Sequence, residues 1–182
     1  MKYYLVALFD RESNAKMEMA QKKLCQKYKL YKNNPMLHIV LETIEDPDID
    51  KLNKVILDIL KPYKRFKVET NGTVCFDPPL RSINLKVENK GYIVRFARQF
   101  NETLKLHGFN VKQNVESFDL HVTLANSNYA VKEWSGNEHV AACSDTKKDG
   151  FYRMSIIDRV EIWKVINNKK EVMVKSFPLR EY

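Results

Sequence analysis

The sequence lacks the short motifs that mark several common classes of enzyme. Its 182 residues contain no GxSxG, no GxxxxGK[ST] and no GxGxxG. It therefore gives no sign of a nucleophile elbow, a P-loop or a dinucleotide-binding turn. No His, Cys and Asp residues cluster at the spacing of metal ligands. We therefore expect neither a metal nor another cofactor.

Signals for export or membrane insertion are also missing. The apolar run at the start stops at Phe9, meets three charged residues and has no small-residue cleavage site. No later segment approaches the length of a membrane span. The only cysteines, Cys25, Cys75 and Cys143, are odd in number, far apart and without a CxxC pair. We expect a cytoplasmic protein with reduced thiols.

The charge and the composition suggest a globular protein with an anionic partner. Apolar residues make up 44% of the chain, which is enough for a folded interior. Lys and Arg number 31 against 23 Asp and Glu, a net charge of +8, which favours nucleotides or RNA as partners. Lysine runs such as the one at 61–67 are expected mostly to form solvated faces, and some to guide RNA phosphates.

Hydrophobic periodicity predicts alternating strands and helices. Strands are expected at 3–9, 37–44, 82–88 and 118–125, and helices at 13–30, 49–59 (ended by Pro62) and 93–107 (closed by Gly108). Asn71-Gly72 predicts a hairpin turn between strands 65–70 and 73–77. A short helix is expected around 133–143, and two long strands over 151–179 around the turn "NNKK".

This order of elements is the same in both halves. A strand, a helix and a strand carrying His38 come first, and a strand, a helix and a strand carrying His121 follow. No Pro/Gly/Ser-rich linker separates them. We therefore predict an α+β fold with two similar lobes related by an approximate two-fold axis, in one domain over residues 1–182.

The two strands also share a short motif. "PMLHIVLE" at 35–42 returns as "FDLHVTLA" at 118–125, so two of only four histidines occupy one repeated frame. Alternate residues of a strand share a face, which puts His38 with Val40 and His121 with Thr123, away from the leucines. Two imidazoles can act as general base and general acid near neutral pH, and a neighbouring hydroxyl can donate to a phosphate oxygen. The other two, His107 and His139, are expected to be structural.

The two His-containing frames, the β-α-β order before each and the closing strand pair resemble the 2H phosphoesterases. The similarity spans nearly the whole chain and is greatest to the 2′-5′ RNA ligase / RNA 2′,3′-cyclic phosphodiesterase branch, whose mark is two His-x-Thr/Ser motifs. It implies antiparallel sheets around a central cleft. It also implies metal-independent opening of 2′,3′-cyclic phosphates of RNA ends or nucleotides, and possible action on 2′-5′ linkages. The resemblance gives His38 the acid role and His121 the base role.

One motif departs from the family pattern. His121-Val122-Thr123 fits fully, whereas Val40 stands where the first motif should have a hydroxyl. Besides Val40, Arg81 and Tyr4 are expected to border the substrate, by contacting phosphate or stacking a base. We expect a monomer acting on an RNA end or a cyclic nucleotide. A catalytically weakened RNA- or nucleotide-binding module and a protein-interaction domain on the same scaffold remain as alternatives.

Overall fold

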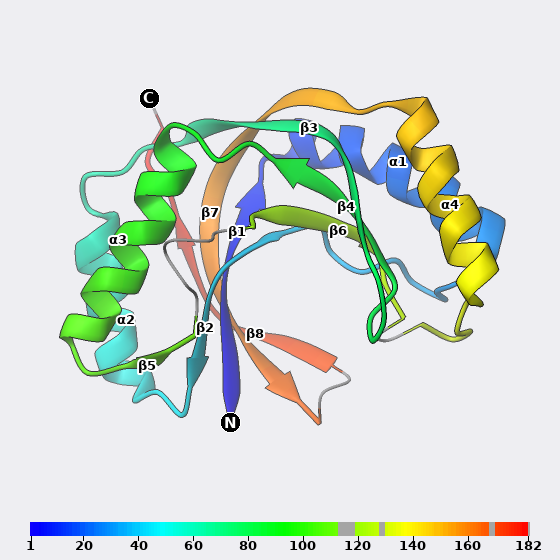
Figure 1. Ribbon diagram of the computed structural model, residues 1–182. Coiled ribbons are helices and arrows are strands. Elements are labelled where there is room, and N and C mark those ends of the chain that lie inside the picture. Colours follow the sequence, from blue (N-terminus) through cyan, green and yellow to red (C-terminus); the bar gives the residue numbers. More distant parts are fainter. Residues whose placement is uncertain (113–118, 128–129, 168–169, 182) are drawn as a thin grey trace.

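The computed structural model describes residues 1–112, 119–127, 130–167 and 170–181. Strands occupy the middle of the molecule, with α2 and α3 on one side and α1 and α4 on the other (Figure 1). The elements run in the order β1 (Lys2–Phe9), α1 (Arg11–Tyr28), β2 (Ile39–Glu45), α2 (Ile49–Leu60), β3 (Phe66–Phe76), β4 (Ser82–Val87), α3 (Tyr92–Leu106), β5 (Asn110–Val111), β6 (His121–Ala125), α4 (Gly136–Asp149), β7 (Tyr152–Ile166) and β8 (Lys170–Pro178).

The strands form one antiparallel sheet in which the two predicted halves meet. Its order is β1-β2-β6-β4-β3-β7-β8, and β1 also pairs with β7. In each half the strands on either side of a helix pair with one another: β1 with β2 around α1, and β4 with β6 around α3. The halves join where Ile39 of β2 pairs with Val122 of β6. This arrangement confirms the predicted α+β fold with duplicated lobes.

Local sequence explains where α1 and α4 begin. Asp10 caps α1 by accepting a hydrogen bond from the Ser13 backbone N–H at 2.8 Å. Ser135 and Glu138 form a reciprocal capping box at the start of α4. Side chains of this kind satisfy backbone donors that have no partner within the helix.

One apolar core lies between the sheet and the helices. Ile39 and Val122, the pair that joins the halves, are both fully buried in it. A second, smaller cluster lies on the opposite face of the sheet and comprises Val6, Leu8 and Trp163, with Tyr4 and Val40 packed against it. We call Val6, Leu8 and Trp163 the small apolar cluster. Alternation along the strands thus produces two faces, of which the second carries His38 and His121.

Some sequence predictions were wrong. Residues 66–76 form a single strand, and Asn71-Gly72 lies at a register shift between Thr70 and Thr73, where β3 passes from β7 to β4. Because β3 pairs with both β7 and β4, this segment stays extended instead of forming a hairpin turn. The last helix is later and longer than expected, and β5 was not expected at all. Residues 168–169 of the predicted "NNKK" turn, and residue 118 of the predicted strand 118–125, lie outside the described residues.

The expectation of reduced thiols was also wrong. Cys75 of β3 and Cys143 of α4 form a disulfide across 68 residues of sequence, while Cys25 is free and buried. Sequence spacing does not show which cysteines meet in space. Disulfides persist mainly in oxidising environments, so the cysteines do not support the cytoplasmic assignment. Among the described helices, none is long and apolar enough to span a membrane.

Candidate active site

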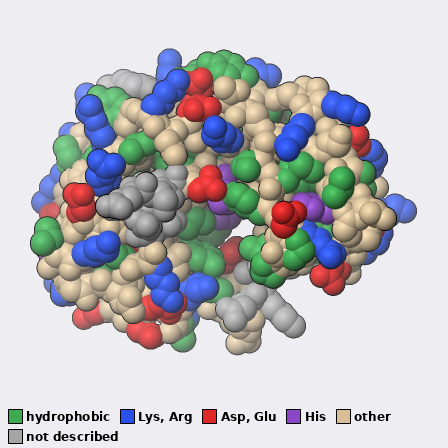
Figure 2. Space-filling view, in the orientation of Figure 1, with side chains coloured by type: hydrophobic (Ala, Val, Ile, Leu, Met, Phe, Trp, Pro, Cys, Tyr) green, Lys and Arg blue, Asp and Glu red, His purple; other side chains and the backbone are tan. Residues whose placement is uncertain are grey.

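The structure brings His38 and His121 onto neighbouring strands. His38 immediately precedes β2, His121 begins β6, and both side chains are partly exposed. The pairing of Ile39 with Val122 places the two histidines diagonally across the strand pair and on one face. Figure 2 shows histidine and hydrophobic side chains on the wall of a hollow in the middle of this face.

The two imidazoles are oriented in the same way. Nδ1 of His38 lies 2.8 Å from the carbonyl oxygen of Met36, and Nδ1 of His121 lies 2.8 Å from that of Asp119. Each carbonyl belongs to the residue two positions earlier. A carbonyl only accepts, so Nδ1 carries the hydrogen in both rings and the neutral ring keeps a lone pair on Nε2. The repeated frame therefore presents two equivalent Nε2 atoms.

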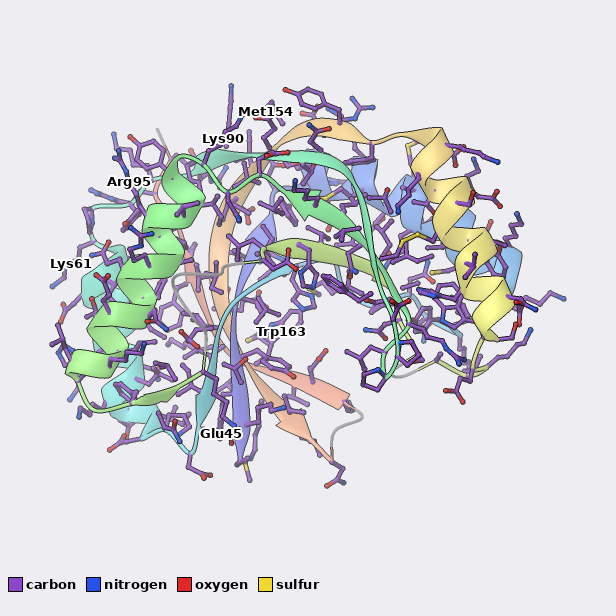
Figure 3. The ribbon with its side chains drawn as sticks, in the orientation of Figure 1. Glu45, Lys61, Lys90, Arg95, Met154 and Trp163 are labelled. Atoms are coloured by element: carbon purple, nitrogen blue, oxygen red, sulfur yellow. A yellow bond between two sulfur atoms is a disulfide. The ribbon has the colours of Figure 1, made fainter. Side chains whose placement is uncertain are left out.

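Each imidazole packs against an aromatic side chain. Trp163 of β7 lies 4.5 Å from His38 between ring centroids, and Phe76 of β3 lies 5.1 Å from His121 in an edge-on arrangement. Trp163 is 6% exposed and lies in the middle of the molecule (Figure 3). These rings fix the imidazoles in place and exclude water from one side of each.

The environment of His38 favours its neutral form. Burial lowers the pKa of His38 to about 4; the Met36 carbonyl and Glu161 act in the opposite direction, while the charge of His121 lowers the pKa further. This effect of His121 on His38 is a second indication that the two imidazoles are close. His38 is therefore neutral at pH 7 in the free protein, which does not suit the acid role that the resemblance implies.

Comparison with known proteins adds the family. A family model described as the AKAP7 2'5' RNA ligase-like domain matches residues 6–172. The chain belongs to this family. No match is found among curated protein sequences.

Solved structures share the fold of this 2'5' RNA ligase-like domain. TT0787 of Thermus thermophilus has a TM-score of 0.65 at 15% identity, covering 100% of this chain and 99% of the other. E. coli LigT complexed with ATP has a TM-score of 0.58 at 11% identity, covering 99% and 98%. A structure titled as a phosphoesterase has a TM-score of 0.59 at 10% identity, covering 99% and 98%. Family and fold together support a phosphoesterase role.

The second motif of this 2'5' RNA ligase-like domain is embedded in polar neighbours. Thr123 donates its hydroxyl hydrogen to Oδ1 of Asn84 at 2.7 Å. The fully buried Asn84 uses Nδ2 to donate to the Val74 carbonyl and to Ser82 Oγ. These bonds fix the orientation of the amide, so the Thr123 hydroxyl points to Asn84 and leaves its lone pairs for other donors. If Thr123 is to donate to a phosphate, its hydrogen bond to Asn84 must break.

The first motif has apolar neighbours instead. Val40 pairs with Val6 of β1, as Thr123 pairs with Asn84 of β4. Val40 packs against the small apolar cluster. The first half therefore has an apolar residue both at position 40 and at its strand partner, Val6, where the second half has Thr123 and Asn84.

The structure places the two remaining predicted substrate-binding residues, Tyr4 and Arg81, in different surroundings. Tyr4 packs against the small apolar cluster, on the face of the sheet that carries His38 and His121. Its pKa is raised by burial and by the charges of Glu171 and Glu45. Arg81 precedes β4, but its Nη1 donates to the Trp134 carbonyl at 3.0 Å while Trp134 Nε1 donates back to the Arg81 carbonyl at 3.0 Å. Arg81 thus links two loops, and a phosphate contact competes with this reciprocal pair.

Sequence reasoning missed several residues of the site. Lys86 pairs directly with His121, so it projects from the same face, and it is exposed. Asn84 and Lys86 alternate with the buried residues of a predicted strand, and this polar alternation was the available signal. No comparable signal marked Trp163 or Phe76, because both lie far from the histidines in sequence.

Glu161 supports the Trp163 side of the site. This buried carboxylate accepts hydrogen bonds from Trp163 Nε1 at 2.7 Å and from Arg159 Nε at 3.0 Å. A cavity of about 310 Å³ beside it has Met36, Trp163 and Met173 in its wall.

In the described part of the chain, no group of three or more His, Cys, Asp or Glu residues is arranged to hold a metal ion. The other two histidines make backbone contacts elsewhere: the buried His139 bonds to the Ser82 carbonyl, and the exposed His107 bonds to that of Thr103.

Proposed function

We propose that the protein is a phosphodiesterase that opens 2′,3′-cyclic phosphates of RNA ends or nucleotides, and that the same site accepts 2′-5′ linkages. The observation that carries this proposal is the pair of imidazoles with the same Nδ1-to-carbonyl bond on neighbouring strands. Two equivalent Nε2 atoms facing one cleft suit the removal of one proton and the delivery of another.

The lowered pKa of His38 favours one assignment of roles within this proposal. A neutral His38 takes a proton from the attacking water, and His121 gives a proton to the leaving ribose oxygen. Lys86, opposite His121, places positive charge where the phosphate oxygens become more negative. This assignment reverses the roles that the resemblance implies. LigT structures with ATP and 3'-AMP support a nucleotide as the class of ligand.

The direct test is incubation of the protein with adenosine 2′,3′-cyclic phosphate in the presence of EDTA. We expect a single adenosine monophosphate with its phosphate at the 2′ position, formed at the same rate with and without the chelator. Loss of activity with EDTA, or no turnover at any protein concentration, contradicts the proposal.

A second candidate is a catalytically weakened nucleotide- or RNA-binding module. Val40 and Val6 favour it, because the first motif offers no hydroxyl to the phosphate. In that case the protein binds adenosine 2′,3′-cyclic phosphate without converting it, and His121→Ala leaves the affinity nearly unchanged. A monomeric, cytoplasmic protein remains a prediction under both candidates.

A further inference from the structure

A separate cavity of about 470 Å³ lies where α2 ends, β3 begins and α3 starts. Its volume is in the range of small-molecule sites. None of the residues described around His38 and His121 lines it. Figure 3 shows Lys61 and Arg95, which flank this region, at the edge of the molecule, whereas Trp163 lies in its middle. Its wall is formed by Pro62, Tyr63, Lys64, Arg65, Phe66, Lys67 and Tyr92.

The wall is strongly basic. Lys64, Arg65 and Lys67 are three cations within four residues, and they belong to the lysine run at 61–67. The Arg95 charge acts on Tyr63 of the same wall, where it opposes the effect of burial on the tyrosine pKa. Such a concentration of positive charge raises the local concentration of anions.

Arg65 already holds an anionic group. Its Nη2 lies 3.3 Å from Oε1 of Glu181, whose side chain is 80% exposed. Its Nε is buried and has no hydrogen-bond partner among the described residues. A guanidinium carries several N–H groups that can donate to phosphate oxygens, and Glu181 pairs with Nη2 here. Exposed ion pairs are weak, so a phosphate can replace the Glu181 carboxylate.

An aromatic ring stands beside these cations. Tyr92 is 59% exposed and lies 6.1 Å from Phe66 between ring centroids. Tyr92 also begins α3, which has no side-chain cap and no acidic residue in its first turn, so the helix end favours an anion as well. Cations beside an exposed aromatic ring are the combination by which single-stranded nucleic acids and nucleotides are bound.

We propose that this cavity is a second binding site, for a nucleotide. The phosphate replaces Glu181 at Arg65 and is flanked by Lys64 and Lys67, and the base stacks on Tyr92. The nucleotide is either free or part of a single-stranded RNA. The proposal concerns binding alone and does not depend on the function proposed for the histidines.

The test uses the full chain with His38→Ala and His121→Ala, so that no ligand is consumed. Backbone amide NMR signals are followed during titration with inorganic phosphate, AMP and a short single-stranded RNA at low salt. We expect the signals of Lys64, Lys67 and Tyr92 to shift with AMP and RNA. Arg65→Gln should raise the Kd about tenfold, because a charged contact to the phosphate is lost.

Three further variants sharpen the result. Tyr92→Ala should weaken AMP and RNA but not inorganic phosphate, because only the former carry a base. Glu181→Gln should lower the Kd several-fold, since a competing anion is removed. Lys147→Gln, an exposed cation on α4, is the matched control and should leave the Kd unchanged.

The outcomes separate the two sources of the nucleotide. Signal shifts with both AMP and RNA support a site for free nucleotides, and signal shifts with RNA alone support a site for single-stranded RNA. Equal affinity for inorganic phosphate and AMP overturns the nucleotide assignment. Unshifted signals at Lys64 and Tyr92, or equal effects of Arg65→Gln and Lys147→Gln, overturn the site itself. In the chain with both histidines, Arg65→Gln should leave turnover of adenosine 2′,3′-cyclic phosphate unchanged.

Discussion

The β1–β2 pair and the β4–β6 pair repeat the same backbone with opposite side-chain chemistry. Val6 faces Val40 in the first pair, whereas Asn84 faces Thr123 in the second. The histidine of each pair bonds to a carbonyl two residues earlier. The two pairs thus share the orientation of their imidazoles and differ in the residues around them.

This difference gives the two halves different tasks. Around His38, Trp163 and the small apolar cluster make the neutral imidazole the stable form. Around His121, Lys86 and the hydrogen-bonded pair of Thr123 and Asn84 supply charge and polar groups. We infer that the first half activates water and that the second half holds the phosphate.

Removing either imidazole should have the largest effect. His38→Ala and His121→Ala each lose one proton-transfer group, so kcat/KM on adenosine 2′,3′-cyclic phosphate should fall about 10²–10⁴-fold. Unchanged unfolding curves in urea check that the fold is intact. His107→Ala, at a histidine outside the cleft, is the control and should retain full activity.

The polar pair should matter less than the histidines. Thr123→Val removes the hydroxyl, and because its hydrogen is shared with Asn84 we expect kcat to fall about 10–10²-fold, below the 10²–10³ of a dedicated oxyanion donor. Thr123→Ser keeps the hydroxyl and should restore most of kcat. Equal rates for Thr123→Val and the wild type would show that the polar half does not serve the phosphate.

Giving the apolar half the polar residues of the other half should raise kcat. Val40→Thr with Val6→Asn recreates the pair formed by Thr123 and Asn84, and we expect kcat to rise about tenfold as a second polar group reaches the phosphate. Val40→Thr alone is the single-site comparison; its hydroxyl has no Asn84 counterpart, so stability should fall by about 1 kcal/mol. A loss of activity in the double variant would mean that the dry surface around His38 is itself required.

The smallest effect concerns stability rather than rate. The pKa of His38 is about 4 in the folded protein and 6.5 without the fold. Between these values the unfolded chain binds more protons, so the contribution of neutral His38 is complete above pH 6.5 and is lost as the pH falls through 4. Lowering the pH from 7.5 to 4.5 should therefore reduce the free energy of unfolding, measured in urea, by about 2 kcal/mol less in His38→Gln than in the wild type. Identical pH dependence would contradict the lowered pKa.

Much of the fold could be predicted because its signals are local. Ile49, Leu52 and Ile56 mark α2 by their spacing, and the repeated Leu-His frame located both inner strands. Asn71-Gly72 misled because a strand with two partners tolerates a register shift where an isolated segment would turn.

The site was only partly predictable for a related reason. The histidines and Val40 lie within the motif, but Trp163 reaches His38 from another part of the sheet, and Cys75 meets Cys143 through the packing of α4 on β3. Only the tertiary fold brings such residues together. Arg81 shows the converse: it occupies a position that suits a phosphate, and its bonds with Trp134 give it a structural partner.

The central claim is that His38 and His121 act together on one phosphate, and a double-mutant cycle tests it most directly. The measurement is kcat/KM on adenosine 2′,3′-cyclic phosphate, in EDTA, for the wild type, His38→Ala, His121→Ala and the double variant. Residues that act as a unit are strongly non-additive, so the double variant should be no slower than the slower single variant. Losses that multiply, or a single variant that keeps wild-type activity, would contradict a shared site.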